Sequence, residues 1–260
     1  MPRTPAVVSL HIWGVPTRHV ATAVTHMARH RRPARTLPGV QFAKLLGTGT
    51  GQTFTPRDAD PHHWGVLLCW SDDRGPEQLR GSRLAADWDR IAEESATWIM
   101  RPLSSRGLWS GTQPFGDPTP TRWDGPVAAL TRGRIRPRMW RTFWSSVPPV
   151  ALDVHRGGGL TFATGIGEAP IGLQGTFSTW SDGAALTDFA HRRSPHQQVI
   201  AQTSTLDWYS EELFARFALL EATGTVAGQA VTGAGRALPE RQASHAQPED
   251  PGTPPHAPQP

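Results

Sequence analysis

The order of the elements that the sequence predicts is repeated once along the chain, and this repeat restricts the fold more than any other feature. Apolar patterning predicts the order β-α-β-β-α-β over residues 6–110 and again over residues 127–230. The first half is predicted to hold strands at Ala6–Val15, Val40–Leu46, Trp64–Trp70 and Thr97–Leu103, and helices at Arg18–Arg31 and Pro76–Glu94. The second half is predicted to hold strands at Val127–Arg134, Leu160–Ile166, Gly172–Trp180 and Trp208–Leu220, and helices at Met139–Ala151 and Ala184–Ser204.

Identical residues at one spacing support a duplication. The run Trp70-Ser71-Asp72 returns 110 residues later as Trp180-Ser181-Asp182. At the same spacing Trp98 matches Trp208, and Arg106 matches Arg216. Repeated identities at one fixed offset are the sequence signature of an internal repeat.

A β-α-β-β-α-β unit is ferredoxin-like, so the chain is predicted to be an α+β protein of two tandem ferredoxin-like halves. The halves are residues 6–110 and 127–230, joined by a linker of residues 111–126. Each sheet has an apolar face to bury, which it can do by pairing face to face with the other sheet or edge to edge in a barrel. One chain then supplies both halves of a barrel, and association between copies through exposed sheet edges stays open.

The last segment, residues 231–260, is predicted to be a disordered tail. It is rich in Pro, Gln and Ala and lacks apolar periodicity. The preceding residues are enough to bury a sizeable core.

Charge and cysteine content exclude several classes. The net charge is +4 and the pI about 10.4, but Lys44 is the only lysine and the arginines are interspersed with acids, so nucleic-acid binding is not expected. The dense group of Arg132, Arg134, Arg136, Arg138 and Arg141 is interpreted as a solvated face, with an anion or redox-partner patch as the alternative.

Cys69 is the only cysteine, so no disulfide can form within the chain. The N-terminal apolar run is too short for a signal peptide, and no stretch reaches the ~18 apolar residues of a membrane span. A cytoplasmic protein is expected, with at most peripheral contact with a membrane.

Three long segments of the chain are FAKLLGTGTGQTFTPRDADPHHWGVLLCW (Phe42–Trp70), GIGEAPIGLQGTFSTWSD (Gly165–Asp182) and PHQQVI…WYSEELFARF (Pro195–Phe217). They resemble the spheroidene monooxygenase family of carotenoid biosynthesis. The similarity covers about residues 6–225 and largely keeps the spacings.

This resemblance implies a haem-dependent monooxygenase that adds oxygen to an acyclic carotenoid, forming a hydroxyl and then a ketone. It implies haem b as cofactor, dioxygen, an electron donor such as a ferredoxin, and a hydrophobic substrate. The family is also similar to dimeric α+β barrel proteins, several of which carry haem. A barrel that holds the macrocycle is therefore expected.

The expected axial ligand of the haem iron is His196. It lies in the segment that matches the family, directly after Pro195, which would fix the direction of the imidazole. A capping or partly buried histidine is the structural alternative, and Tyr209 and Cys69 are the other candidate ligands. The first-half helix carries Ala86 where an offset of 110 would place His196, so a single haem is expected, in the second half.

Arg216 is the expected partner of the haem propionates, because a guanidinium can bind a carboxylate with two parallel hydrogen bonds. An internal salt bridge to Glu211 or Glu212 is the alternative, and Lys44 and Arg192 are weaker candidates.

The glycine turns around Gly47 and around Gly165 and Gly167 lack the pattern of a phosphate-binding loop. They are interpreted either as close backbone approach to a flat ligand or as hairpins.

Gln174, His63 and Thr176 are the candidate catalytic residues, because oxygen activation needs polar groups that steer dioxygen. The 11 tryptophans are interpreted mainly as core, and otherwise as the lining of a polyene channel. His26 and His30 lie four apart on a helix and could hold a metal, with a wet helix face as the alternative.

Three functions remain open from the sequence. The first is the haem monooxygenase, and the second is a haem lyase similar to aldoxime dehydratase. The third is a barrel without catalytic activity that binds a small apolar ligand.

Overall fold

The computed structural model describes residues 3–49, 58–135, 158–168, 175–191, 209–231 and 233–234. The predicted helix Met139–Ala151, the end of the predicted helix Ala184–Ser204 and most of the predicted tail lie outside these residues.

The first half contains four strands and several short helices. Its elements are β1 (Val7–Gly14), the 3-10 turn η1 (Thr17–His19), α1 (Val20–Arg29), α2 (Arg31–Thr36), β2 (Val40–Gly49), β3 (Ala59–Trp70), α3 (Gly75–Arg80), α4 (Arg83–Asp89) and β4 (Glu94–Gly107). The predicted helix Pro76–Glu94 is two helices, because Ser82 is extended and its Oγ caps α4 by accepting a hydrogen bond from the backbone N–H of Ala85.

The second half repeats the strands. Its described elements are β5 (Val127–Ile135), β6 (Leu160–Gly167), β7 (Gly175–Trp180), α6 (Gly183–His191), β8 (Tyr209–Val226), β9 (Gln229–Ala230) and β10 (Gly233–Ala234). Val231 is buried and β10 pairs with β8, so the structure extends beyond residue 230, where the tail was predicted to begin.

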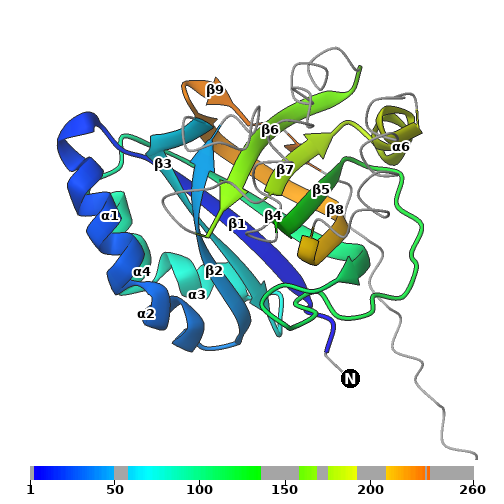
Figure 1. Cartoon of the computed structure of the whole chain (residues 1–260), viewed down its shortest axis with the longest axis horizontal. Coiled ribbons are helices and arrows are strands. Elements are labelled where there is room, and N and C mark those ends of the chain that lie inside the picture. Colours follow the sequence, from blue (N-terminus) through cyan, green and yellow to red (C-terminus); the bar gives the residue numbers. More distant parts are fainter. Residues whose placement is uncertain are drawn as a thin grey trace, which may run out of the picture.

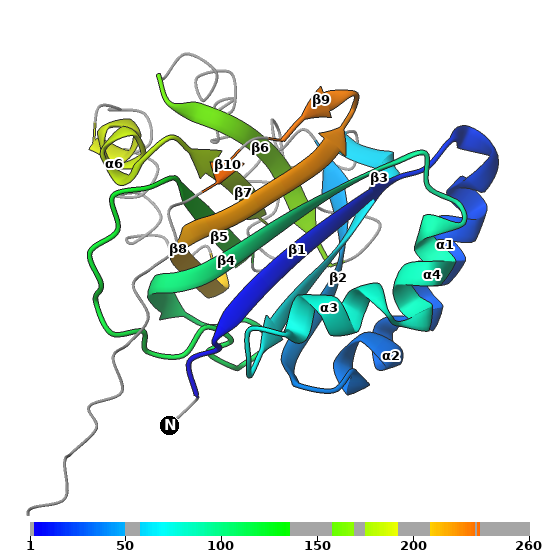
Figure 2. The same ribbon diagram turned by 180° about the vertical axis from the view of Figure 1, so that it is seen from behind.

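The strands close into a ring, as Figures 1 and 2 show from opposite sides. Their order is β8-β4-β1-β3-β2-β6-β7-β5, and β5 pairs back to β8. The two halves occupy opposite arcs and meet edge to edge at β2–β6 and β4–β8. The predicted α+β fold of tandem ferredoxin-like units, arranged as in a dimeric barrel, is confirmed.

β2 pairs antiparallel with β3, and β6 with β7, as the hairpin interpretation expected, but the described glycines lie in the strands themselves. Gly47 pairs with Gly167 and Gly49 with Gly165, so these glycines lie in adjacent antiparallel strands where the halves join. Gly47 and Gly167 are equivalent residues of the two halves, and the pseudo-two-fold axis passes between them.

The duplication is real, but its spacing is not constant. Val7 pairs with Trp70 and Val127 with Trp180, so β5 follows β1 by 120 residues and β7 follows β3 by 110. Met100 pairs with Val8 and Phe217 with Ala128, so β8 follows β4 by 117 residues.

The proposed matches of Trp98 with Trp208 and of Arg106 with Arg216 are therefore wrong, whereas the Trp-Ser-Asp match is right. Gly107 and Gly224 confirm the spacing of 117, because they have almost the same positive φ, 98° and 97°.

The interior of the closed sheet is filled by apolar side chains. Trp98, Phe177, Phe217, Trp109 and Phe115 are all essentially inaccessible there. Eight-stranded barrels are just wide enough for their own side chains. Side chains therefore occupy the interior, so a macrocycle held by the barrel would have to lie outside the ring of strands. For these residues the core interpretation of the aromatic side chains is right.

Different layers cover the outer faces of the two halves. Helices α1 to α4 lie on one side of the closed sheet and α6 on the opposite side (Figures 1 and 2). The first-half face and its helices form one core that includes Trp13, Trp64, Leu68 and Trp88. No helix in the described part of the chain has the length and apolar character that a membrane crossing needs.

Two glycines in the same region separate the effect of backbone strain from that of a steric clash. Gly107 and Gly111 both have positive φ, 98° and 72°, but a Cβ at Gly107 would fall on the carbonyl oxygen of Glu212, whereas one at Gly111 would meet nothing. We expect Gly111→Ala to cost about 1–2 kcal/mol of unfolding free energy. Gly107→Ala should cost roughly 1–3 kcal/mol more, because β8 must shift. Urea titration of both variants checks this; equal costs would contradict the close packing of β4 on β8.

Candidate functional site

The outward side of the second-half sheet is built from small and polar residues, and we call it the C-half face. Its members are Ala163 and Gly165 of β6, Thr176 and Ser178 of β7, Ala129 and Thr131 of β5, and Phe214 and Arg216 of β8. Along these strands the alternate residues Ile166, Phe177 and Leu213 lie in the barrel interior. One row across the face runs Gly165, Thr176, Thr131, Phe214, and the next runs Ala163, Ser178, Ala129, Arg216.

The equivalent face of the first half is bulkier. Its rows are Leu45, Val66, His11, Thr97 and Ala43, Leu68, Ser9, Ile99. Leu45 and Leu68 are buried there against the helices. Glycine and serine, at Gly165 and Ser178, replace these two leucines in the second half.

The substitutions reduce the side-chain bulk at the centre of the C-half face and increase it at the β8 edge. Thr131 stands where the first half has His11, and Thr176 where it has Val66. At the β8 edge the change is opposite, because Phe214 and Arg216 replace Thr97 and Ile99. The centre of the face therefore carries small and polar side chains, and its β8 edge, which we call the rim, carries the two large exposed ones, Phe214 and Arg216.

The rim is exposed and holds cationic groups. Phe214 is 38% exposed, and the guanidinium of Arg106 on β4 lies 5.2 Å from its ring centroid. Arg216 is exposed beside it, and no ion pair joins it to Glu211 or Glu212 within the described residues. Arg216 is thus free to reach a carboxylate of a ligand lying on the face.

The predicted site residues divide into three groups. Thr176 and Gly165 lie on the C-half face, with Arg216 at its rim, and Gly167 lies just beyond on β6. His63 belongs to the first half, away from this face. His196, Gln174 and the weaker candidate Arg192 lie outside the described residues.

The face offers hydroxyls but no ligand for haem iron. Oγ1 of Thr131 and Oγ1 of Thr176 lie 2.7 Å apart in a hydrogen bond across β5 and β7. The eight residues of the face include no His, Cys, Met or Tyr. No group of three or more His, Cys, Asp or Glu side chains in the described residues could hold a metal ion.

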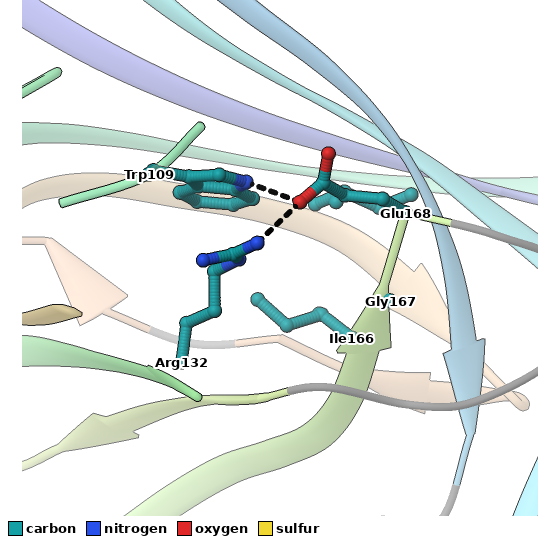
Figure 3. Close-up of a pocket in the computed structure, with 6 residues that line it drawn as sticks. Trp109, Arg132, Ile166, Gly167 and Glu168 are labelled. Atoms are coloured by element: carbon teal, nitrogen blue, oxygen red, sulfur yellow. Dashed lines mark hydrogen bonds and ion pairs between the residues drawn. The ribbon is translucent and has the colours of Figure 1, made fainter. Parts of the chain in front are cut away.

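Behind the face, inside the barrel, lies a buried ion network (Figure 3). Nε1 of Trp109 and Nη2 of Arg132 donate to Oε1 of Glu168 over 2.6 and 2.8 Å. Nζ of Lys44 donates to Oε2 of Glu168 over 2.5 Å, and Nη1 of Arg132 donates to Glu211 over 2.5 Å. Arg132 is only 3% exposed, so its assignment to a solvated face is wrong.

The network keeps its carboxylates ionised. Burial pushes the pKa of Glu168 upward, but the hydrogen bonds from Lys44 and Trp109 and the charge of Arg132 outweigh it and lower the pKa. Lys44 is consequently committed to an internal ion pair, so it is unsuited to a haem propionate. This network was not predicted from the sequence, because its members come from three distant strands and two connecting segments.

Two glutamates accept hydrogen bonds from backbone N–H groups of the turns that follow β4 and β8, and we call each of these contacts a clamp. Glu211 accepts hydrogen bonds from the backbone N–H groups of Ser110 and Gly111 at 2.9 and 2.7 Å. Glu94, 117 residues earlier, accepts from Ala227 and Gly228 at 2.8 and 3.1 Å. Each clamp joins the two halves across the β4–β8 seam.

The counter-ions of the two clamps differ. Arg132 is the counter-ion of Glu211. The partner of Glu94 is His63, whose Nε2 lies 2.9 Å from the carboxylate. Nδ1 of His63 also meets Asp60 at 2.6 Å. The hydrogen bond to Asp60, with that to Glu94, raises the pKa of His63 against the effect of burial. Both ring nitrogens are occupied, which makes His63 a structural cation rather than a group that steers dioxygen.

His26 and His30 are buried, contrary to the wet-face interpretation. Their rings lie 5.3 Å apart and His26 lies 5.2 Å from Trp88. Burial lowers the pKa of both imidazoles. Cys69 is fully buried in the barrel core, and burial raises the pKa of its thiol, so it is unsuited as a thiolate ligand.

Comparison with known proteins gives relatives over most of the chain. Spheroidene monooxygenase of Rhodobacter capsulatus is 35% identical over 219 residues, which are 82% of this chain and 89% of that protein. The same enzyme of Rubrivivax gelatinosus is 38% identical over 199 residues, 76% and 75% of the two chains. No family model matches the chain.

A solved structure with a similar fold is that of aldoxime dehydratase in complex with butyraldoxime. Its TM-score is 0.51 at 10% identity, over 82% of this chain and 79% of that one. At this identity the likeness concerns the fold alone.

The two clamps generate a prediction on pH dependence. Since the folded pKa of His63 is raised above its ordinary value of 6.5, its stabilisation is complete below that pH and is lost as pH rises through the folded pKa. Urea titrations should therefore show that His63→Gln removes a loss of stability above about pH 6.5.

Arg132→Gln is the matched control at the other clamp. It should cost roughly 3 kcal/mol, because it strips a counter-ion from buried carboxylates. This cost should not change between about pH 6 and 9, since arginine stays charged there. An unaltered pH profile of the His63→Gln variant would refute the assignment.

Proposed function

The chain belongs to the spheroidene monooxygenase family, and from this membership we propose that it is a haem-dependent monooxygenase of an acyclic carotenoid. The proposed location of the cofactor rests on the difference in side-chain size between equivalent positions of the two halves. Where Leu45 and Leu68 fill the first-half face, the smaller residues Gly165 and Ser178 stand on the C-half face.

The proposed reaction balances with dioxygen and an external donor. One oxygen atom enters a C–H bond of the polyene as a hydroxyl. The other leaves as water with two protons and two electrons, which a donor such as a ferredoxin supplies. A second round at the same carbon gives a geminal diol, which loses water to form a ketone.

The residues of the C-half face suit a flat cofactor with carboxylate arms. Haem b would supply the activation of dioxygen, and His196 is the proposed axial ligand. Arg216 at the rim would bind a propionate, because its guanidinium is exposed and lacks an ion pair within the described residues. Gly165 would let the macrocycle approach the backbone of β6.

The remaining proposed roles are the orientation of dioxygen by polar groups and contact with the substrate by an apolar side chain. Thr176, together with Gln174 in its predicted role, would orient dioxygen on the sheet side. The exposed ring of Phe214, held in place by Arg106, would offer an apolar contact to the polyene.

Spectroscopy tests the cofactor and its ligand. Protein from haem-supplemented cells should show a Soret band with one haem per chain, and His196→Ala should abolish or displace it. His191→Ala, five residues earlier, is the control and should keep the band. Absence of haem from the wild type, with no uptake of added hemin, would reject the proposal, and an unchanged spectrum of His196→Ala would reject the ligand.

Restoring first-half bulk tests the face. Gly165→Leu copies Leu45 and should reduce haem content at least about tenfold, since steric exclusion of a few kcal/mol has that effect. Ser95→Leu, at an exposed position of β4 that pairs with β1, is the control and should leave haem content unchanged. Equal haem content in both variants, with equal melting temperatures, would place the cofactor elsewhere.

Substrate assays separate the enzyme classes. The loaded protein should consume dioxygen and reductant with an acyclic carotenoid and yield a hydroxylated product. Dehydration of an aldoxime without dioxygen would instead identify a lyase, and ligand binding without turnover a carrier.

A further inference from the structure

A groove with a volume of about 290 Å³ lies between the start of β2, the end of α2 and the turn that follows β4. Among the described strands, β2 pairs with β6 only from Gly47 to Gly49, so its preceding residues have a strand neighbour on one side alone. The side chains that decide the chemistry of the groove are Arg35, Phe42, Lys44 and Ser110. Its volume is close to the ~300 Å³ at which small-molecule sites begin, so a ligand would be small.

Ser110 presents a hydroxyl donor to this groove. Nζ of Lys44, a residue that is only 8% exposed, donates a hydrogen bond to Oγ of Ser110 over 2.6 Å. Because an ammonium group cannot accept, the hydroxyl hydrogen of Ser110 must be directed elsewhere. No described residue accepts it, and Ser110 is exposed, so the hydrogen is available to a ligand in the groove.

The turn that carries Ser110 does not itself favour a serine. Ser110 and Gly111 have positive φ, 55° and 72°, and Trp109 and Thr112 exchange backbone hydrogen bonds on either side of them. Two successive positive φ values are typical of a type I′ turn, whose central positions favour glycine, asparagine and aspartate. The advantage of serine at this position therefore lies in its hydroxyl.

The equivalent turn of the second half lacks this donor. Ala227 lies 117 positions after Ser110 and has almost the same φ, 50°. Thr164 stands 120 positions after Lys44, at the equivalent place of β6. The pair of ammonium and hydroxyl is therefore specific to the first half.

The charges at the groove favour a ligand with one negative charge. The ion network behind it is balanced, because it contains two cations and two carboxylates: Lys44, Arg132, Glu168 and Glu211. Arg35 at the groove is exposed and has no ion pair among the described residues. Its guanidinium can bind a carboxylate with two parallel hydrogen bonds.

We propose that this groove binds a small organic monocarboxylate. The carboxylate accepts hydrogen bonds from Ser110 and Arg35, and the apolar body of the ligand lies against Phe42. That ring is half-buried and packs edge to face on Trp109, with 5.6 Å between the centroids. Lys44 is a positioning residue, because its hydrogen bond orients the hydroxyl of Ser110. The site involves no haem, so it is independent of the proposed function.

Fluorine NMR with para-fluorobenzoate is a direct test, because this probe joins a carboxylate to an aromatic ring. The wild type should broaden the fluorine signal in a saturable manner. Ser110→Ala copies Ala227 and should weaken binding about tenfold or more, the effect of losing one hydrogen bond to a charged acceptor. Arg35→Gln should weaken binding to a similar extent.

Matched controls separate this site from general attraction of anions. Arg32→Gln removes the same charge from an exposed position of the same helix, outside the groove, and should leave the affinity unchanged. The neutral probe para-fluorobenzamide should bind at least about tenfold more weakly than the carboxylate. Ser110→Gly also removes the hydroxyl but relieves the positive φ, so a loss of binding in this variant cannot come from a strained turn.

The outcomes decide the proposal. It is overturned by a wild type that does not bind para-fluorobenzoate saturably, or by equal affinities in the wild type, Ser110→Gly and Arg35→Gln. Tighter binding of inorganic phosphate than of the benzoate would overturn the ligand class. Weaker binding in Ser110→Ala, Ser110→Gly and Arg35→Gln, with wild-type affinity in Arg32→Gln, supports it.

Discussion

The antiparallel pairing of β4 with β8 is the interaction on which the rest of the structure depends. It closes the ring of strands and lies at the seam between the halves. Glu94 and Glu211 fix it at both ends by satisfying the backbone N–H groups of the turns beyond. These turns contain Ala227 and Ser110, non-glycine residues with positive φ, and the hydrogen bonds to the two half-buried glutamates offset this backbone strain.

Closure also determines where a ligand can bind. The inward-facing side chains of the strands form the core of the ring, so only the outward faces remain for a ligand. In the first half that side is covered by helices packed on Leu45 and Leu68. The second half repeats the backbone but carries Gly165 and Ser178 there. Duplication thus leaves the outer face of one half packed against helices with large apolar side chains, while the equivalent face of the other half carries smaller ones.

The sequence predicted the fold well because local patterns determine it. Alternating apolar strands and the Trp-Ser-Asp turns recur where equivalent strands end, so the order of elements could be read directly. A single offset of 110 failed because the connecting segments differ in length, which moves β8 to an offset of 117. The constant offset of 110 also missed the correspondence between Thr131 and His11, because these residues lie 120 positions apart.

The site was less predictable, because its side chains obtain their roles from distant partners. His63 looked like a free polar group, but Asp60 and Glu94 hold both ring nitrogens. Arg132 looked like part of a charged surface run, but it meets carboxylates from β8 and from the residue that follows β6. Neither pairing can be recognised from the local hydrophobic periodicity of the sequence.

The buried ion network supports the C-half face from inside the barrel. A face with little bulk gains little stabilisation from a covering layer, so it needs support from within. Arg132 adjoins Thr131 on β5, and Glu168 follows Gly167 at the end of β6, so their ion pair ties these strands together directly beneath the face. Apolar residues of similar volume would fill the same interior without desolvation cost. Only a directional pair, however, fixes the register of β5 against β6, two strands that are not neighbours in the ring, and so sets the spacing between Thr131 and Gly165.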